Sequence, residues 1–298
     1  MKIVTVSGGV DSMVLLDMCV KKFGRDNVVV AHFDHCTRPS SETDRMFVQK
    51  FCLDRGIKCE SKRTKREMSE HLPEKEARNM RYNFFAQVRE KYGANEIWVA
   101  HHLDDLVESV AINLLRGTGW RGLSVMNSSG VKRPLIDGEF GRVYDKRDIL
   151  KYAADNGVCY RQDPTNTEDI YLRNRVRRVT FELPREVKDE LWVLRSKQCK
   201  LRVEVAEAVD TVIGLLVGNG EWREVEGTLA VPRGVFGEMD DAVAMEVIEV
   251  LVKERLGAKC TRPQLRDFLG AIREYAPGKV FNLPRGKLVR MGREFFVI

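Results

Sequence analysis

Residues that could bind a phosphate ester stand together in the stretch SGGVDS, residues 7–12. This polar segment lies between the apolar run 3–6 and a second apolar run that begins at Met13, so it is expected to join a buried strand to a helix. Its two glycines permit positive φ angles and close approach of a ligand to the backbone. Its two serines place hydroxyls beside the N–H groups left free at a helix start. Such a corner favours an anion, most often a phosphate.

Asp11 separates this loop from the commoner phosphate loops. A Walker loop needs GxxxxGK[ST] and a dinucleotide fingerprint needs GxGxxG, and neither spacing is present. A carboxylate beside a phosphate would repel it unless a hard cation such as Mg²⁺ lies between them. An ordinary tight turn is the alternative interpretation of the glycines and serines alone. SGGxDS directly after a first strand resembles the pyrophosphate loop of the ATP-pyrophosphatase superfamily, whose members cleave ATP to AMP and pyrophosphate to adenylate a substrate.

The second group of reactive side chains is in HHLDDLVE, residues 101–108. Apolar residues from Leu103 to Leu115 fall on one face of a helix, and carboxylates gather at its first turns. Acidic residues there also complement the helix dipole, which is the ordinary explanation of a single Asp. Asp105 and Glu108, three residues apart, are the oxygen ligands that a Mg²⁺-ATP site needs. The adjacent histidines could bind zinc, but no Cys or third His stands at zinc spacing.

The elements that must position these residues alternate along the first half of the chain. Strands are predicted at 3–6, 28–33, 58–61 and 96–100, with amphipathic helices at 14–22, 44–53 and 74–91 between them. This alternation predicts an α/β fold with a parallel sheet and crossover helices. Ligands of such sheets bind at the carboxyl ends of the strands, so SGGVDS, HFDH and HHLDD are expected to open onto one crevice.

The character of the chain changes near residue 180. Long helical periodicity is predicted at 185–217, 240–256 and 263–275, the last behind a Thr261 cap, and the tail KVFNLPRGKLVRMGREFFVI predicts short antiparallel strands. We therefore expect an ATP-binding catalytic domain at 1–180 and a smaller, mainly helical domain at 181–298.

Composition narrows the class of protein. The chain has 298 residues, of which 43% are hydrophobic and 32% charged, as in a soluble globular protein. No apolar stretch approaches 18 residues, and MKIVTV enters a strand without a signal peptide, which predicts a cytoplasmic protein with no membrane partner. The seven cysteines form no CxxC pair and are expected to be free thiols. The formal charge of +6 permits a nucleic-acid partner without requiring one.

The order of the motifs identifies a family. VSGGVDS, AHFDHCTRPSSETD, EKEARNMRYNFF, VAHHLDDLVESVAINLLRGTGWRGL, VKRPLI, KRDILKYAADNGVCYRQDPTN and YLRNRVRR closely resemble, in this order, bacterial tRNA(Ile)-lysidine synthetase. The resemblance covers residues 3–180 strongly and the carboxyl-terminal tail more loosely. It implies ATP-dependent ligation of free L-lysine to C2 of the wobble cytidine of tRNA(Ile) with a CAU anticodon, through an adenylated intermediate. This reaction changes both the codon read and the amino acid that the tRNA accepts.

The resemblance also implies roles for individual residues. Asp11 and Asp105 would bind Mg²⁺, and Asp105 and Glu108 would serve the metal, lysine or both. His101 would hydrogen-bond a phosphate or the reacting base. Arg81 would lie against ATP or the activated cytidine, although an exposed helix-face arginine is the alternative. The ATP phosphates would be held by Ser7, Gly8, Gly9, Val10, Asp11 and Ser12.

The basic segment LRNRVRR, residues 172–178, is the predicted tRNA contact. Its density of guanidinium groups suits RNA phosphates, while a solvated charged face is the alternative. The residues that the resemblance carries over to tRNA are Arg173, Asn174, Arg175, Arg177 and Arg178. The domain at 181–298 would bind tRNA as well.

Two other functions stay open from the sequence. A tRNA thiolase of the same superfamily would adenylate the base and then deliver sulfur, and Cys36, which is expected beside the crevice, keeps this reading open. A nucleotide-binding regulatory module without turnover is the other alternative, although such a module needs neither the carboxylates nor LRNRVRR. A homodimer is compatible with either enzyme.

Overall fold

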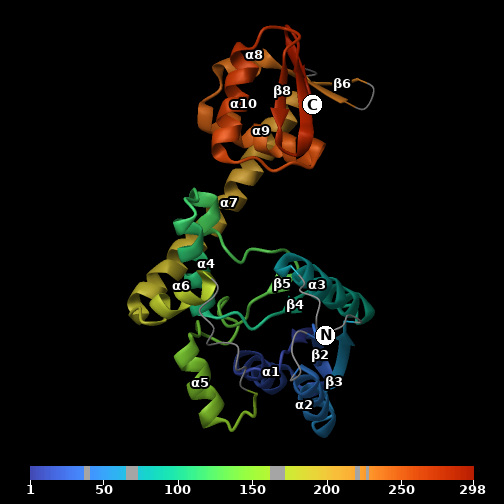
Figure 1. Ribbon diagram of the computed structural model, residues 1–298, viewed down its shortest axis with the longest axis vertical. Helices are drawn as coiled ribbons and strands as arrows, with labels where there is room; N and C mark the ends of the chain where they lie inside the picture. The colour runs from blue at the N-terminus through green and yellow to red at the C-terminus, as the bar shows by residue number, and fades with distance from the viewer. Residues whose placement is uncertain (37–40, 65–72, 162–171, 219–221, 226–227) are drawn as a thin grey trace. The chain divides into compact units, whose positions relative to one another are not determined.

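The chain forms two compact units, Met1–Lys197 and Gln198–Ile298. The computed structural model describes residues 1–36, 41–64, 73–161, 172–218, 222–225 and 228–298 (Figure 1). Each unit has its own sheet and its own hydrophobic core, and each is described by itself.

A parallel five-stranded sheet with the strand order β3-β2-β1-β4-β5 organises the first unit. Its strands are β1 (Lys2–Thr5), β2 (Val28–Asp34), β3 (Lys58–Arg63), β4 (Ile97–Trp98) and β5 (Val131–Lys132). Ile3 of the central β1 is in register with Val29 of β2 and with Ile97 of β4, so the strand order reverses at β1. The predicted α/β class is confirmed. The two-residue β5 was not predicted, because so short a strand has no periodic pattern.

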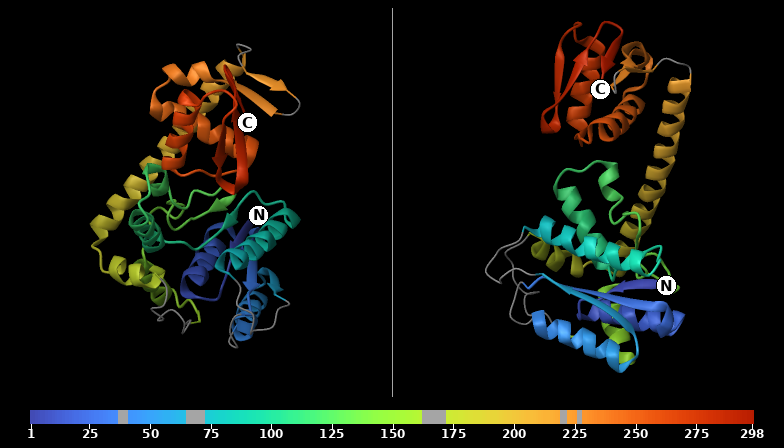
Figure 2. Two further views of the ribbon diagram at one scale, coloured as in Figure 1. Left: turned by 45° about the horizontal axis from the view of Figure 1, so that its top comes forward. Right: turned by 90° about the vertical axis from the view of Figure 1, so that its right-hand side faces the viewer.

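Helices cover both faces of this sheet (Figure 2). Adjacent side chains of β1 point to opposite faces, so Val4 packs with α1 (Val10–Phe23), α2 (Ser41–Asp54) and α5 (Lys146–Asp155). Ile3 packs on the other face against Phe84 and Val88 of α3 (Glu74–Lys91). The loop between β1 and α1 therefore lies at the end of a strand that is buried on both sides.

The helix α4 (Leu103–Leu115) carries the predicted carboxylates and has a separate apolar core. Leu103, Leu106, Val107 and Val110 are buried on one face, as the periodicity predicted. Leu191 and Trp192 of α7 (Arg185–Gly218) pack against this core. The short α6 (Leu172–Phe181) precedes α7 and contacts α4.

The division between the units falls within α7, later than the boundary expected near residue 180. The reason is that the first part of α7 bonds to the first unit. Trp192 Nε1 donates to the carbonyl of Ile136 at 3.0 Å, and Arg195 Nε donates to the carbonyl of Val125 at 3.0 Å. Helical periodicity predicts that α7 is long, but it does not show which side each turn packs against.

The second unit combines helices with an antiparallel sheet of order β6-β7-β10-β9-β8. Its helices are α8 (Arg233–Glu238), α9 (Asp241–Leu256) and α10 (Arg262–Glu274), and Thr261 caps α10 as predicted. Its strands are β6 (Arg223–Val225), β7 (Thr228–Pro232), β8 (Val280–Leu283), β9 (Lys287–Met291) and β10 (Phe295–Val297). The predicted strands of the tail are present, whereas β6 and β7 were not predicted. No helix within the described ranges of either unit is both long enough and apolar enough to span a membrane.

Leu106→Ala is expected to lower the free energy of unfolding of the first unit by about 2–5 kcal/mol, because it leaves a cavity where a fully buried side chain packs. Leu115→Ala is the matched control on the same helix, since Leu115 is 69% exposed, and it should change stability by no more than about 0.5 kcal/mol. Urea unfolding followed by circular dichroism measures both. Equal effects would mean that the buried face of α4 is assigned incorrectly.

Candidate active site

The loop between β1 and α1 turns sharply at Gly8, where φ is +96°. L side chains rarely adopt this conformation, and a Cβ at this position would lie 3.5 Å from Val48 Cγ2. The Ser12 hydroxyl donates to the carbonyl of Gly9 at 2.9 Å and accepts the N–H of Ser7 at 3.1 Å. The serines of SGGVDS thus fix the turn from within. Because no side chain of the described residues caps α1, its first N–H groups can bind an anion.

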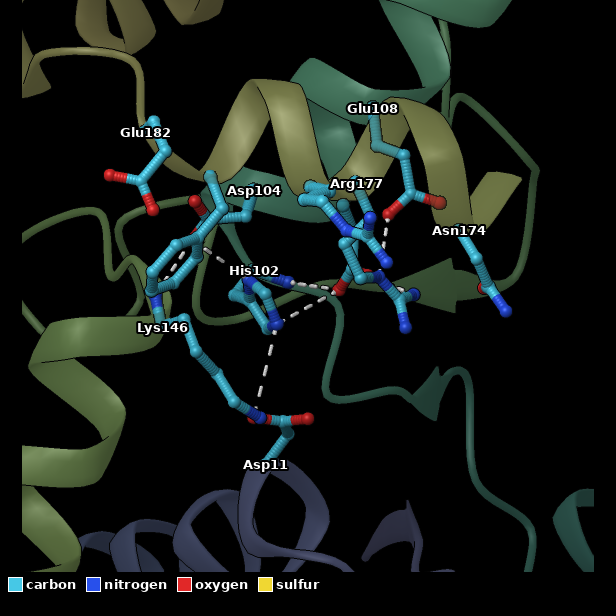
Figure 3. Close-up of a pocket in the computed structure, with 11 residues that line it drawn as sticks. Asp11, His102, Asp104, Glu108, Lys146, Asn174, Arg177 and Glu182 are labelled. Atoms are coloured by element: carbon cyan, nitrogen blue, oxygen red, sulfur yellow. Dashed lines mark hydrogen bonds and ion pairs between the residues drawn. The ribbon is translucent and has the colours of Figure 1, made fainter. Parts of the chain in front are cut away.

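Two cavities meet at the carboxyl ends of the strands. The smaller, of about 300 Å³, is lined by Ser7, Gly9, Ser12, Arg81, Tyr82 and His101. The larger, of about 500 Å³, is lined by His102, Glu108, Lys146, Asn174, Arg177 and Arg178 (Figure 3). Asp11 and Asp105 line both cavities. The predicted phosphate loop and the predicted carboxylates therefore face one another.

His102 lies among three carboxylates and is only 7% exposed. Its Nε2 is 3.8 Å from Asp11 Oδ1 and 3.4 Å from Asp105 Oδ2, and its Nδ1 is 3.4 Å from Asp104 Oδ2 (Figure 3). Burial lowers the pKa of His102, but the charges of Asp105, Asp104 and Asp11 together outweigh burial and raise it above its ordinary value. The imidazole thus holds the carboxylates of two elements together.

The same contacts keep the carboxylates ionised. Burial raises the pKa of Asp105, but the charge of His102, the hydrogen bond from the His102 backbone N–H and the charge of Arg177 act against burial, and the pKa lies below its ordinary value. Burial also raises the pKa of Asp104, and the contact with His102 together with the hydrogen bonds from Lys188 and from the Lys146 backbone N–H lower it by more. Negative charge is therefore maintained where a cation would bind.

Lys146 is a site residue that the sequence analysis missed. Its Nζ is 2.6 Å from Asp11 Oδ1, and its backbone N–H donates to Asp104 Oδ2 at 2.7 Å. It stands at the first position of α5, behind the cap in which Asp145 accepts the N–H of Asp148 at 2.8 Å. The cap signal DKRD predicts where this helix begins, but nothing local shows that its first side chain reaches Asp11.

Glu108 is almost completely buried and is bound by two arginines of α6. Arg177 Nε donates to Glu108 Oε2 at 3.1 Å, and Arg173 pairs with the other oxygen. Arg177 also approaches Asp105, with 4.0 Å between Nη2 and Oδ1. Residues four apart share a helix face, so Arg173 and Arg177 both reach Glu108 of α4, whereas Arg175, two residues from each, does not share that face. The predicted tRNA segment thus also contributes to the larger cavity, through Asn174, Arg177 and Arg178.

His101 belongs to the smaller cavity, apart from its neighbour His102. Arg133 Nε donates to His101 Nδ1 at 3.3 Å, so Nε2 carries the proton of the neutral ring. Burial lowers the pKa of His101 to about 4, which keeps the ring neutral at physiological pH. Arg133 was not predicted from the sequence, although it lies in the quoted motif VKRPLI. Arg81 lines the same cavity.

The carboxylates fit a divalent cation that is bound together with phosphates. Among the described residues no three His, Cys, Asp or Glu side chains are grouped so that they could hold a metal ion by themselves. Mg²⁺ keeps several waters and is usually bound by one or two carboxylates plus substrate phosphates. Asp11 and Asp105 meet that requirement, because both border the cavity beside the phosphate loop.

The cysteines lie away from both cavities. All seven are within the described residues, and none lines either cavity. Cys36, which the sequence placed beside the crevice, is 5% exposed. Its Sγ accepts a hydrogen bond from Arg63 Nε at 2.8 Å and faces the carbonyl of Thr64 at 3.6 Å.

Comparison with known proteins places the chain in a family. The family described as PP-loop domain matches residues 2–183. The tRNA(Ile)-lysidine synthase of Thermotoga sp. (strain RQ2) is 31% identical over 307 residues, which cover 99% of this chain and 67% of that protein. The enzyme of the same name from Mycoplasmopsis pulmonis is 38% identical over 183 residues, 59% of this chain and 60% of that protein. Two parts of the sequence motifs that carry the resemblance, CTRPSS and QDPTN, include residues 37–40 and 162–166, which lie outside the described residues.

A solved structure shares the fold. The U34-tRNA thiolase NcsA from Methanococcus maripaludis, with its [4Fe-4S] cluster, aligns with a TM-score of 0.53 and 18% identity, over 67% of this chain and 71% of that chain. This likeness concerns the fold alone. The chain spans about two thirds of the length of the Thermotoga relative, with which it aligns almost from end to end. Together with the match over residues 2–183, this similarity shows that the chain belongs to the tRNA(Ile)-lysidine synthase family of PP-loop proteins.

Proposed function

We propose that this chain uses ATP to adenylate the wobble cytidine of tRNA(Ile) with a CAU anticodon and then joins free L-lysine to C2 of that base. The observation that carries the proposal is that Asp11 and Asp105 border both a cavity beside the phosphate loop and a second cavity of mixed charge. A ligase of this kind needs such an arrangement, because a nucleotide and a second substrate must meet at one reacting carbon.

The smaller cavity would hold ATP. The loop N–H groups and the hydroxyls of Ser7 and Ser12 would bind its phosphates, and Asp11 and Asp105 would hold Mg²⁺, which supplies charge neutralisation to the departing pyrophosphate. The O2 oxygen of cytidine attacks the α-phosphorus, and the bond to pyrophosphate breaks. Arg81 and neutral His101 border this cavity and would contact the nucleotide or the base.

The larger cavity would hold lysine. Its carboxylates, Asp105 and Glu108, suit an ammonium group, while Arg177 and Arg178 suit the lysine carboxylate. A deprotonated amine of lysine attacks C2, the bond from C2 to the adenylated oxygen breaks, and AMP leaves. The amine proton must pass to a base, and Asp105, an ionised carboxylate that lines both cavities, would receive it.

The tRNA would be bound in part by LRNRVRR. Arg175 and Arg178 are both exposed and lie outside the pair that binds Glu108, and of the two only Arg178 lines the larger cavity. Arg175 is therefore the arginine best placed to contact the RNA backbone. A tRNA substrate implies a cytoplasmic reaction. Residues of one chain line both cavities, so the proposed chemistry does not require a second copy of the chain.

The direct test is incubation of the purified protein with ATP, Mg²⁺, lysine and a CAU-anticodon tRNA transcript, followed by mass analysis of the anticodon fragment. A mass gain of one lysine on the wobble cytidine, with release of AMP and pyrophosphate, is expected. ATP binding without any change in the tRNA would support the regulatory module instead.

Asp105→Asn should lower the rate of lysine transfer by about 100-fold, because it removes the charge that both cavities share while its amide oxygen can still accept the N–H of His102. Asp155→Asn on α5 is the control and should retain the full rate, since Asp155 lines neither cavity and is paired with the exposed Lys151. Labelled lysine counted on the tRNA measures both variants. An unchanged rate in Asp105→Asn would remove Asp105 from the site.

Arg175→Ala should weaken tRNA binding and lower the slope of log affinity against log salt by roughly one, as expected for one lost phosphate contact. ATP affinity should stay the same, because Arg175 lines neither cavity. Lys151→Ala, which also removes an exposed helix cation, is the control. An unchanged slope in Arg175→Ala would mean that this arginine is solvent-exposed and makes no contact with a tRNA phosphate.

Cys36→Ser should retain lysine transfer, because no thiol takes part in either half-reaction. Single Ser replacements at the other cysteines should also be active, apart from stability losses of about 1–3 kcal/mol at buried positions. A thiolase needs a thiolate to carry or release sulfur, so one folded variant would be inactive. Sulfur on the tRNA, or an inactive folded variant with normal ATP binding, would favour the thiolase.

A further inference from the structure

Lys188 is a buried cation that the proposed mechanism does not use. It lies on the first part of α7, its side chain is only 2% exposed, and its Nζ donates to Asp104 Oδ1 at 2.7 Å. The same ammonium donates to the carbonyl of Phe181 at 2.9 Å. Removing a lysine from water costs several kcal/mol, so a lysine is seldom buried unless its partners hold it in one geometry.

Asp104 connects Lys188 to the site. Its Oδ1 accepts from Lys188, and its Oδ2 accepts the N–H of Lys146 at 2.7 Å and lies 3.4 Å from His102 Nδ1. With both oxygens engaged by donors from different elements, the carboxylate is fixed in rotation. Because Asp104 lies at Nδ1 of His102, it orients the ring so that Nε2 points away from Asp104.

The orientation of His102 matters because of what lies beyond it. Its Nε2 faces Asp105 Oδ2 at 3.4 Å and Asp11 Oδ1 at 3.8 Å, and these carboxylates belong to different elements, α4 and α1. A rotation of the ring would remove the shared cation between them, and like charges would then separate.

We propose that Lys188 is a positioning residue: by fixing Asp104 it sets the direction of His102, and His102 sets the spacing of Asp11 and Asp105 for Mg²⁺-ATP. The inference rests on the proposed function for its cation and nucleotide, but not on the identity of the tRNA product. It predicts that Lys188, which lines neither cavity, affects the Mg²⁺ dependence of ATP binding. Partners of this kind typically change metal affinity or activity by 10–100-fold.

The test uses three variants: Lys188→Met, Asp104→Asn, and the double variant that combines them. Trp192→Phe is the control. Trp192 lies one helical turn beyond Lys188 and also donates one hydrogen bond to the first unit, to the carbonyl of Ile136, but it lines neither cavity. Titration calorimetry of ATP at several Mg²⁺ concentrations gives the Mg²⁺ dependence of binding. Nitrogen-15 spectra of the histidine rings in the free protein, assigned with His102→Asn, report the protonation and hydrogen bonding of both ring nitrogens of His102.

Lys188→Met and Asp104→Asn should each raise the Mg²⁺ concentration needed for half-maximal ATP binding by about tenfold and change the ring signals of His102. The double variant should need no more Mg²⁺ than the more strongly affected single variant. The reason is that both substitutions act through the same contact, the one between Asp104 and His102. Trp192→Phe should leave both measurements unchanged. If Lys188→Met does not fold, the nearly isosteric Asp104→Asn tests the same contact by itself.

Three results would overturn the inference: normal Mg²⁺ dependence and His102 signals in a folded Lys188→Met or Asp104→Asn variant, additive effects in the double variant, or an equal effect in Trp192→Phe. The last result would mean that any weakened contact of α7 disturbs the site. Failure of the proposed function is a separate result, because the wild-type protein would then bind Mg²⁺-ATP normally but add no lysine to the tRNA.

Discussion

The need to balance buried negative charge governs the candidate active site. Asp104 and Glu108 lie on α4 at 7% and 1% exposure, and a carboxylate at that depth is stable only with a cation in contact. The chain supplies these cations from two other helices: Lys188 of α7 pairs with Asp104, and Arg173 and Arg177 of α6 pair with Glu108. Lys146 of α5 adds its backbone N–H to Asp104 and its ammonium to Asp11 of α1. The helices α6 and α7 are therefore held to α4 by the same charges that prepare the site for its ligands.

This balance explains why the site could be predicted only in part. SGGVDS and the carboxylates of α4 were predicted, because a loop conformation and a helix face depend on residues close in sequence. The partners of these carboxylates depend on the tertiary fold: Lys188 meets Asp104 across 84 positions and Lys146 meets Asp11 across 135. A lysine that will be buried in an ion pair has no local signature, since the surrounding pattern is that of an ordinary amphipathic helix. The short strands β5, β6 and β7 were missed for a related reason, because pairing with neighbours, and not their own pattern, defines them.

The arginines of α6 show where local reasoning could have gone further. Their density predicted phosphate contacts for the whole segment, yet Arg173 and Arg177 are four residues apart and turn to one partner, Glu108. Helical spacing alone would have separated these two from Arg175. It would not have identified Glu108, because an acidic residue on the exposed side of α4 in the sequence pattern becomes buried only when α6 packs there.

Because Glu108 is already paired with two arginines, lysine binding under the proposed function would be an exchange of cations. The lysine ammonium would compete for Glu108 with Arg177, which is held beside it at a high and constant effective concentration. One cation would replace another, so the net charge around Glu108 would hardly change and little favourable Coulomb energy would be gained. Discrimination between amino acids must come from elsewhere in the cavity, from chain length and from the carboxylate end. Ornithine and arginine would therefore be distinguished from lysine by how their side-chain length fits the cavity, and much less by their electrostatic attraction to Glu108.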